Sequence, residues 1–241
     1  MWIYGRNPVL EALQQGQVER LLLAKGVKDA SVVAHRKAAR AAGVPVDMVP
    51  RIELDQALGT TQHQGVAAQL PELAYQPLEA AFSLAASREE HLLLVLLDQV
   101  QDPRNYGAII RSAEVLGAHG VVTETRRSAP LSGVVAKTAA GAASHLPLIQ
   151  VANLPNLMRD LKDRGVWIYG ADGEGDATPE QLDWRRDVAL VIGSEGRGVR
   201  PVVRKGCDAT VRIPTRGAID ALNASVAAGV LLYAAMHARG A

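Results

Sequence analysis

Short runs of apolar residues recur along the second half of the chain, separated by stretches with helical periodicity. The clearest run is HLLLVLLD at residues 91–98, which has no polar alternation. Such a run is typical of a strand buried on both faces of a parallel sheet. Further strands are predicted at residues 120–123, 147–151, 166–170, 188–192 and 209–213. The pattern therefore predicts an α/β domain with a mostly parallel sheet.

A smaller α/β unit is predicted in the first half of the chain. Asn7 and Pro8 fit the N-cap and first turn of a short helix. Strands are expected at residues 18–24, 44–49 and 65–70, and helices at 29–42 and 52–58. Pro71 and Pro77 interrupt the periodicity, and no clear strand signal follows before Glu90. We therefore predict a first domain at residues 1–73, a linker at 74–90 and a second domain at 91–241.

The last helix is expected from about residue 220 to residue 239. Residues at three- and four-residue spacing place one largely apolar face on this helix: Leu222, Val226, Val230, Tyr233 and His237. This face is expected to pack either on the sheet or on another subunit.

Composition excludes several classes of protein. The 241 residues are 48% hydrophobic, yet no uninterrupted apolar run reaches the ~18 residues that predict a membrane span. The first residues, MWIYGRNPVLEAL, lack the features of a signal peptide, so a soluble, cytoplasmic protein is expected. The single cysteine, Cys207, cannot form an internal disulfide, and the histidines do not have metal-ligand spacing. No metal is predicted.

The formal net charge is only +1, so any binding of RNA must depend on local patches. One basic run contains Arg197, Arg200, Arg204 and Lys205, and is followed by Arg212 and Arg216. An RNA-binding patch and an ordinary solvated basic face are both compatible with this run.

Three loops that follow predicted strands carry unusual side chains, and in an open parallel sheet ligands bind beyond the carboxyl ends of the strands. The first loop, DQVQDPRNYGAIIR, places Asn105 at the start of a helix. Gly107 shares a helical face with Arg111, and a glycine there would leave room for a substrate beside the guanidinium. Taken alone, this loop favours a capping asparagine and a surface arginine.

The second loop, VIGSEGRG, surrounds Glu195 with glycines, and its simplest interpretation is a tight turn. Its spacing matches neither the dinucleotide-binding nor the triphosphate-binding glycine motif. The third loop, RIPTRGAIDALNAS, brings Asn223 and Ser225 to the start of the last helix. Together the loops supply two amides, an arginine, a carboxylate and a hydroxyl at one sheet edge, which favours a functional site over chance.

In order and separation these loops resemble the three motifs of the SpoU/TrmH class of SPOUT methyltransferases: N-x-G-x-x-x-R, G-[SA]-E-G-x-G and I-P-x-x-G-x(4)-L-N-x-S. The segments IYGRNPVLEAL and GTTQHQGVAA resemble the family's small RNA-binding domain of the ribosomal-protein type. The resemblance implies a trefoil-knotted catalytic domain and a homodimer with its sites at the interface. It also implies S-adenosylmethionine-dependent methylation of a ribose 2'-hydroxyl in RNA, most similar to that of a guanosine in bacterial 23S ribosomal RNA.

The resemblance further implies a role for each matching residue. The catalytic set would be Asn105, Arg111, Glu195, Asn223 and Ser225. Arg111 would act either as general base or as an anchor for a phosphate and the developing alkoxide, because a guanidinium rarely loses its proton. Asn105 and Glu195 would orient Arg111 and the ribose.

The predicted cofactor contacts lie in the same loops. S-adenosylmethionine would touch the backbone around Gly193, Ile213 and Leu222, with Ala171 a weaker candidate. The chain departs from the family at Ala221, where a serine is usual. The loss of that hydroxyl leaves the acceptor nucleotide less defined, with Thr215 and Asp220 as candidate replacements.

Other functions are compatible with parts of the pattern. The chain could bind S-adenosylmethionine and RNA without catalysis, although the presence of Asn105, Arg111 and Glu195 argues against this. A small-molecule enzyme with a nucleotide cofactor is a third hypothesis. Among RNA substrates, transfer RNA or a different ribosomal nucleotide stays open, while the first domain favours ribosomal RNA.

Overall fold

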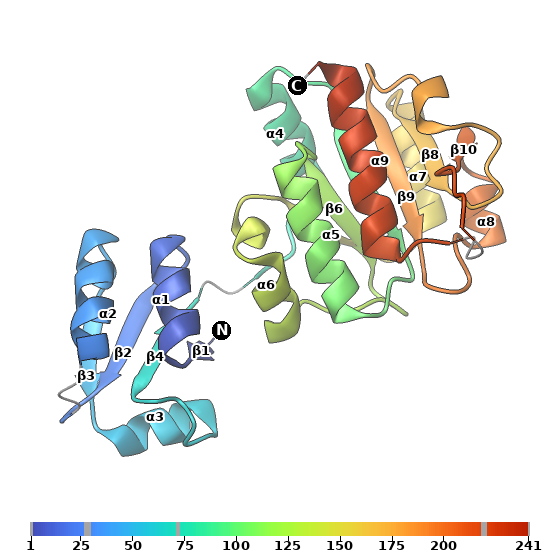
Figure 1. The fold of residues 1–241 in the computed structure, drawn as a ribbon. Coiled ribbons are helices and arrows are strands. Elements are labelled where there is room, and N and C mark those ends of the chain that lie inside the picture. The colour runs from blue at the N-terminus through green and yellow to red at the C-terminus, as the bar shows by residue number, and fades with distance from the viewer. Residues whose placement is uncertain (1, 27–29, 71–72, 218–220, 241) are drawn as a thin grey trace. The chain divides into compact units, whose positions relative to one another are not determined.

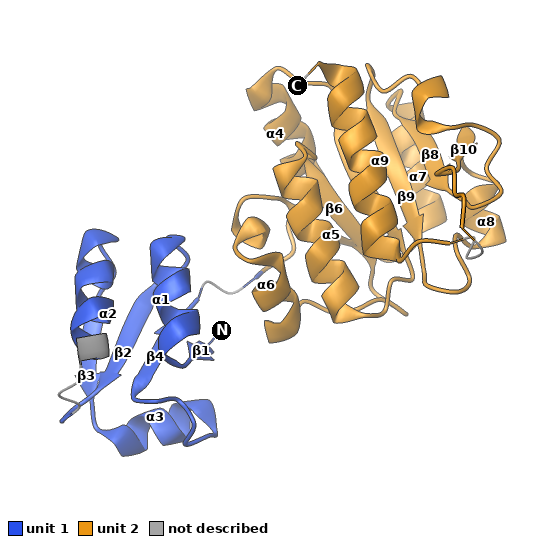
Figure 2. Cartoon of the chain, viewed as in Figure 1, with its two compact units in different colours: residues 1–73 blue, residues 74–241 orange. Residues whose placement is uncertain are grey.

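The computed structural model describes residues 2–26, 30–70, 73–217 and 221–240. The chain forms two compact units, residues 1–73 and residues 74–241 (Figure 2). Each unit has its own sheet and its own hydrophobic core. Among the described residues, no helix combines the length and the apolar character needed to cross a membrane.

The first unit is a four-stranded sheet with helices on both faces. Its elements are β1 (Trp2–Tyr4), α1 (Arg6–Gln14), β2 (Arg20–Ala24), α2 (Ala30–Ala41), β3 (Val46–Val49), α3 (Arg51–Leu58) and β4 (Val66–Gln69). The strand order is β1-β4-β2-β3, with β2 parallel to β3 and the other pairs antiparallel. Helices α1 and α2 pack on one face and α3 on the other (Figure 1).

The start of α1 differs from the prediction. The helix begins at Arg6, and Gly5 occupies the N-cap position with φ 94°, so Asn7 lies inside the helix instead of capping it. The backbone N–H of Arg6 donates to the Gln64 side chain at 3.0 Å, so a distant residue satisfies an amide that a local cap usually satisfies. The pattern also missed β1, because this short strand depends on pairing with β4.

The second unit is a six-stranded sheet in which all paired strands are parallel, in the order β10-β8-β9-β5-β6-β7. The strands are β5 (Leu93–Asp98), β6 (Gly120–Glu124), β7 (Leu148–Val151), β8 (Trp167–Ala171), β9 (Val188–Gly193) and β10 (Ala209–Val211). The α/β fold with a parallel sheet is thereby confirmed, while the trefoil knot stays a prediction.

Helices cover both faces of this sheet, which explains why its strands are apolar throughout. On one face lie α5 (Pro103–Val115), α6 (Gly133–Ala139) and α9 (Ala224–Arg239), and on the other α4 (Glu79–Arg88), α7 (Leu154–Asp163) and α8 (Pro201–Arg204). All six residues of β5 are buried, and the strand lies between β6 and β9. The run at residues 91–98 therefore forms a central strand, as its lack of alternation indicated.

The segment predicted as a linker contains helix α4 and belongs to the second unit. Ala81 and Ala85 are buried in the same core cluster as Leu94 and Leu96 of β5. The prediction was wrong because small alanines form the buried face of α4, so its apolar signal is weak.

Gly107 makes room for a helix instead of for a substrate. A Cβ built on Gly107 would lie 2.6 Å from Thr138 Cβ and 2.7 Å from the carbonyl oxygen of Val135, both in α6. The expectation of substrate space at this glycine is therefore wrong, because the space is filled by packing between α5 and α6.

The predicted apolar face of α9 does not pack on the sheet. Its residues Val226, Val230 and Tyr233 are 50%, 39% and 57% exposed. The opposite face is the buried one and consists of Ala224, Ala228, Leu231, Leu232 and Ala235. Of the two interpretations given by the sequence, only contact with another subunit stays open.

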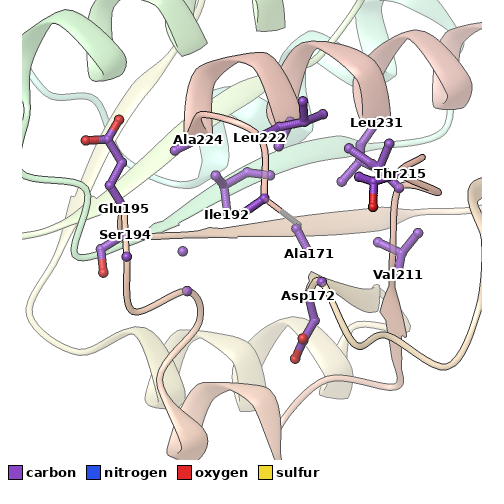
Figure 3. Close-up of a pocket in the computed structure, with 17 residues that line it drawn as sticks. Ala171, Asp172, Ile192, Ser194, Glu195, Val211, Thr215, Leu222, Ala224 and Leu231 are labelled. Carbon is purple, nitrogen blue, oxygen red and sulfur yellow. The ribbon is translucent and has the colours of Figure 1, made fainter. Parts of the chain in front are cut away.

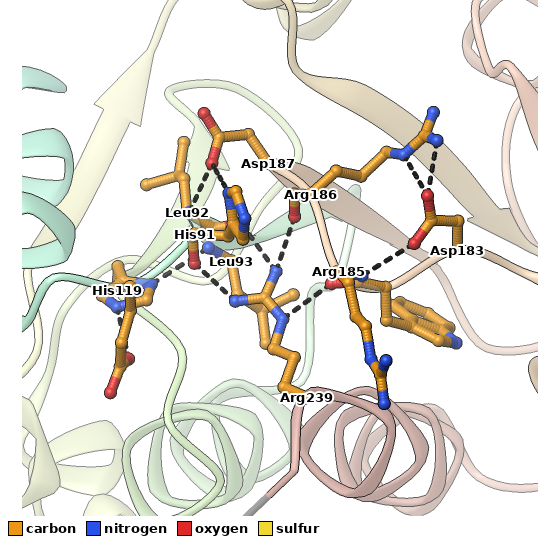
Figure 4. A network of polar contacts seen from close by, with 11 residues as sticks. His91, Leu92, Leu93, His119, Asp183, Arg185, Arg186, Asp187 and Arg239 are labelled. Atoms are coloured by element: carbon orange, nitrogen blue, oxygen red, sulfur yellow. Dashed lines mark hydrogen bonds and ion pairs between the residues drawn. The ribbon is translucent and has the colours of Figure 1, made fainter.

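Arg239 anchors the last turn of α9 to the amino-terminal edge of the sheet (Figure 4). Its guanidinium donates to the carbonyl oxygens of His91, Leu92, Trp184 and Arg186 at 2.5 to 3.0 Å. The helix is thus fixed at its end, while its start faces the carboxyl edge of the strands.

The contact at Gly107 predicts a stability difference between two glycines in helices. Gly107→Ala should lower the free energy of unfolding by roughly 1–3 kcal/mol, because its methyl group would overlap α6. Gly229→Ala in α9 is the matched control, since its nearest neighbour would be Ser112 Oγ at 3.7 Å and alanine favours a helix by up to about 1 kcal/mol. Urea denaturation of both variants at one protein concentration measures this; equal stability would contradict the assignment.

Candidate functional site

Four of the five predicted catalytic side chains meet at the carboxyl edge of the parallel sheet. Glu195, in the loop after β9, accepts hydrogen bonds on Oε1 from Asn105 Nδ2 and from Asn223 Nδ2, the latter at 2.6 Å. Asn223 Nδ2 also lies 3.2 Å from Asn105 Oδ1, and Ser225 Oγ donates to Asn223 Oδ1 at 2.6 Å. The fold therefore joins loops that are far apart in the sequence.

Two helix starts position the amides. Asp102 caps α5 by accepting from the N–H of Arg104 at 2.8 Å, which places the buried Asn105 in the first turn. Asn223 caps α9, because its Oδ1 accepts from the N–H groups of Ser225 and Val226. Helix N-termini favour negative charge, so both helices stabilise the carboxylate of Glu195.

The glycine-rich loop that carries Glu195 is a tight turn. Ser194 and Gly198 form an isolated antiparallel bridge, with backbone hydrogen bonds of 2.9 and 3.1 Å. Gly196 and Gly198 have φ values of 76° and 63°, which favour glycine. Gly193 lies so close to the backbone of Gly198 that no side chain would fit. These glycines serve the turn itself, and the turn fixes where Glu195 lies.

Two cavities adjoin this turn. The first, of about 230 Å³, is bordered by glycine-rich backbone and aliphatic side chains (Figure 3). It includes all three predicted cofactor contacts, Gly193, Ile213 and Leu222, together with Ala171, Thr215 and Ala221. The second cavity has mostly polar neighbours, including Gln99, Gln101, Asp102, Asn105 and Arg197. Ser194 and Glu195 line both cavities, so Glu195 lies where they meet.

Arg111 does not join the other four catalytic candidates. It lies six residues beyond Asn105 in α5, which is about 9 Å along a helix. Its side chain is exposed, lines neither cavity, and has no hydrogen bond or ion pair among the residues that the structure describes. Within a single chain, Arg111 therefore lies apart from Asn105 and Glu195, and their predicted role in orienting it stays a prediction.

The departure at Ala221 falls in the wall of the first cavity. Thr215 lines the same cavity and offers a hydroxyl there. Asp220, the other residue considered as a replacement, lies outside the described residues. The missing serine thus affects the cavity of the predicted cofactor contacts more directly than the polar cavity.

Two of the four basic residues in the run at residues 197–205 form ion pairs within the fold. Arg200 binds Asp98 at 2.5 Å and Glu124 at 2.7 Å, and thereby ties the loop after β9 to the ends of β5 and β6. Burial lowers the pKa of Arg200, but its hydrogen bonds to Glu124 and Asp98 outweigh burial and raise the pKa overall. Arg204 forms an ion pair with Asp172 at 2.8 Å.

Some residues around the second cavity were not selected from the sequence. Gln99, Gln101 and Asp102 precede Asn105 in the loop after β5 and line the cavity with it. Their place directly after a buried strand was the available signal. Within the described parts of the chain, no group of three or more His, Cys, Asp or Glu residues could hold a metal ion.

Family models match both units. Residues 92–233 match the SpoU rRNA methylase family, and residues 2–76 match a domain described as RNA 2'-O ribose methyltransferase substrate binding. A Bacillus subtilis protein assigned to the TrmH family of tRNA/rRNA methyltransferases is 36% identical over 96% of this chain and 93% of its own length.

Solved structures agree with this match. The SpoU methyltransferase AviRb of Streptomyces viridochromogenes, solved with its cofactor AdoMet, has a TM-score of 0.76 and 27% identity, covering 99% of this chain and 90% of AviRb. An AdoMet-bound rRNA methyltransferase of Sinorhizobium meliloti has a TM-score of 0.70 and 25% identity, covering 98% of this chain and 86% of that one. This chain belongs to the SpoU rRNA methylase family and is an RNA methyltransferase by class.

The ion pairs of Arg200 predict that it stabilises the fold. Arg200→Gln leaves the fully buried Asp98 without its cation, so the free energy of unfolding should fall by about 3 kcal/mol. Lys205→Gln removes a charge from the same basic run but no ion pair between described residues, and should change stability by less than about 0.5 kcal/mol. Thermal and denaturant unfolding measure the stability of both variants. Similar losses of stability in the two would contradict the stabilising role of Arg200.

Proposed function

We propose that the chain transfers a methyl group from S-adenosylmethionine to a ribose 2'-hydroxyl of RNA, the acceptor being a guanosine of 23S ribosomal RNA. The observation that carries the proposal is the position of Glu195 between an aliphatic, backbone-lined cavity and a polar cavity. A methyl donor and a hydroxyl acceptor need such adjacent sites, because transfer requires their reacting atoms to be aligned.

The first cavity fits S-adenosylmethionine. Ile192, Ile213 and Leu222 offer apolar contact for an adenine ring, and the turn at Gly193 offers backbone groups without a side chain in the way. Glu195 gives this cavity a carboxylate, which suits a ligand of net positive charge. When bound, the cofactor supplies an electrophilic methyl group on a sulfonium.

The polar side chains around Glu195 hold the acceptor. Each amide N–H donated to Oε1 fixes the carboxylate, and Oε2 has no hydrogen bond among the described residues. We assign to this oxygen the orientation of the 2'-hydroxyl of the acceptor ribose in the second cavity. Ser225 and Asn223 keep the carboxylate in place through their own hydrogen bonds, so the acceptor meets a preorganised site.

Arg111 acts as a charged group in this proposal. A guanidinium keeps its proton at neutral pH, so Arg111 holds an RNA phosphate and stabilises the developing alkoxide. The proton of the hydroxyl then passes to a phosphate oxygen or to water. This role needs Arg111 beside the acceptor, and the single chain does not bring it there.

A homodimer resolves this conflict. Arg111 and Val115 share one exposed face of α5, and Val226, Val230 and Tyr233 form the exposed face of the neighbouring α9. We propose that two copies pack through these faces, so that Arg111 of one copy completes the site of the other. The apolar surface supplies the affinity, and the shared site explains why Arg111 is exposed in one chain.

Ribosomal RNA is the proposed substrate. Residues 2–76 match a substrate-binding domain, and the similar Sinorhizobium meliloti protein is described as an rRNA methyltransferase. The choice of a 23S guanosine rests on the likeness of the sequence motifs alone.

The proposed reaction is tested with radiolabelled S-adenosylmethionine and 23S ribosomal RNA transcribed without modifications. Label should appear as a 2'-O-methylguanosine, which blocks alkaline cleavage at one site. Donor binding without RNA label would favour the non-catalytic alternative, and label on transfer RNA or on a different nucleotide would correct the substrate.

The shared site predicts complementation between two inactive variants. Arg111→Ala and Glu195→Gln should each abolish transfer while leaving the fold largely intact, because Arg111 is exposed and glutamine keeps the acceptor oxygen Oε1. Arg111→Ala should also keep cofactor binding, whereas Glu195→Gln should weaken it, so activity is measured at saturating S-adenosylmethionine. Mixed dimers contain one site with both defects and one with none, so a statistical mixture should recover about a quarter of wild-type activity. Arg159→Ala, at an exposed position on α7, is the control and should stay active. A mixture without activity would place Arg111 in the site of its own chain.

A further inference from the structure

The loop between β6 and α6 carries two adjacent arginines at the same sheet edge as the site. Arg126 and Arg127 are exposed, and neither has a hydrogen bond or ion pair among the residues that the structure describes. Arg197, which borders the polar cavity, is also exposed and without such a partner in the described chain. We call Arg126, Arg127 and Arg197 the arginine rim.

Backbone hydrogen bonds hold this loop against the wall of the polar cavity. The N–H of Ala129 donates to the carbonyl oxygen of Val100 at 2.9 Å, and Val100 lines the cavity. At its other end, the N–H of Thr125 donates to the carbonyl oxygen of Val151 at 2.9 Å. The loop therefore runs from the end of β7 to the loop after β5, beside the proposed acceptor site.

The two neighbouring loops share an unusual backbone conformation. Arg127 and Gln99 both have φ 59°, in the left-handed region that favours glycine. Such a conformation is unfavourable for a non-glycine residue. Each lies within two residues of the hydrogen bond between Ala129 and Val100, so that bond joins two strained loops.

No acid among the described residues pairs with the rim arginines, and the same holds for the exposed Arg104 and Arg216 at this edge. Of the nearby acids, Glu124 is engaged by Arg200, Glu195 by the two amides and Asp102 by the N-terminus of α5. Arg200 and Arg204 of the same basic run are neutralised by ion pairs. A single anionic ligand that reaches both sides of the polar cavity would meet Arg197 on one side and the loop with Arg126 and Arg127 on the other.

From these observations we propose that the arginine rim binds the phosphates that flank the acceptor nucleotide. The inference rests on the proposed function, because it assumes that the acceptor enters the polar cavity. A guanidinium binds a phosphate through two parallel N–H donors, and successive phosphates of one RNA strand supply anions on both sides of an inserted ribose. The rim thereby gives the second unit its own contact with RNA, separate from the first unit.

The test compares two double variants that remove the same charge. Arg126→Gln with Arg127→Gln should weaken binding of unmodified 23S ribosomal RNA roughly 10-fold. The slope of log Kd against log salt concentration should fall by about 1.4, because each phosphate contact with a single strand contributes about 0.7 to this slope. The control combines Arg88→Gln with Lys205→Gln, which are exposed and lie away from the polar cavity. It should keep the wild-type affinity and slope.

Kinetics separate this inference from the reaction itself. The rim variant should raise the KM for RNA while keeping kcat at saturating RNA and the affinity for S-adenosylmethionine. An unchanged affinity for RNA, an equal loss in the control, or a lower kcat with an unchanged Kd would each overturn the inference. If wild-type protein binds this RNA without methylating it, the proposed function fails, and the salt slopes still decide whether the rim binds phosphate.

Discussion

The site depends on one constraint, which is that Glu195 must accept both amide N–H donors on the same oxygen. Asn105 belongs to the first turn of α5 and Asn223 to the cap of α9, so the two hydrogen bonds fix two helices against one loop. Because the N-termini of both helices favour negative charge, they stabilise the ionised carboxylate at this exposed position. The geometry of the two cavities follows, since Glu195 separates them.

The arginines at this edge of the sheet are of two kinds, those in ion pairs within the fold and those without a partner among the described residues. Asp98 is completely buried and needs Arg200, whose guanidinium also reaches Glu124. Glu124 in turn accepts from the N–H of Leu154 at the start of α7. Arginines paired in this way hold the loops, and those without partners among the described residues are the ones proposed to bind the substrate. The net charge of +1 does not show this difference, because paired and unpaired arginines contribute equally to it.

The sequence predicted the features that rest on burial and on loop position. The strand at β5 was identifiable because both of its faces are covered, and Glu195, Asn105 and Asn223 were identifiable because each follows a strand of one sheet. The cap of α1 and helix α4 were not, because the first depends on Gln64 from a distant segment and the second on alanines packed against β5. The partners of Arg200 are likewise 76 and 102 residues away.

The position of Arg111 differs from the one that its spacing in the sequence suggested. Its four-residue distance from Gly107 suggested substrate space, yet α6 fills the space at Gly107. Its six-residue distance from Asn105 gives a rotation of about 240°, which already places the two side chains on different faces of α5. The face that carries Arg111 also exposes Val115 and lies beside the uncovered apolar face of α9. The proposed packing of a second copy on this surface would account both for the distance of Arg111 from the other catalytic candidates and for the exposed apolar residues of α9.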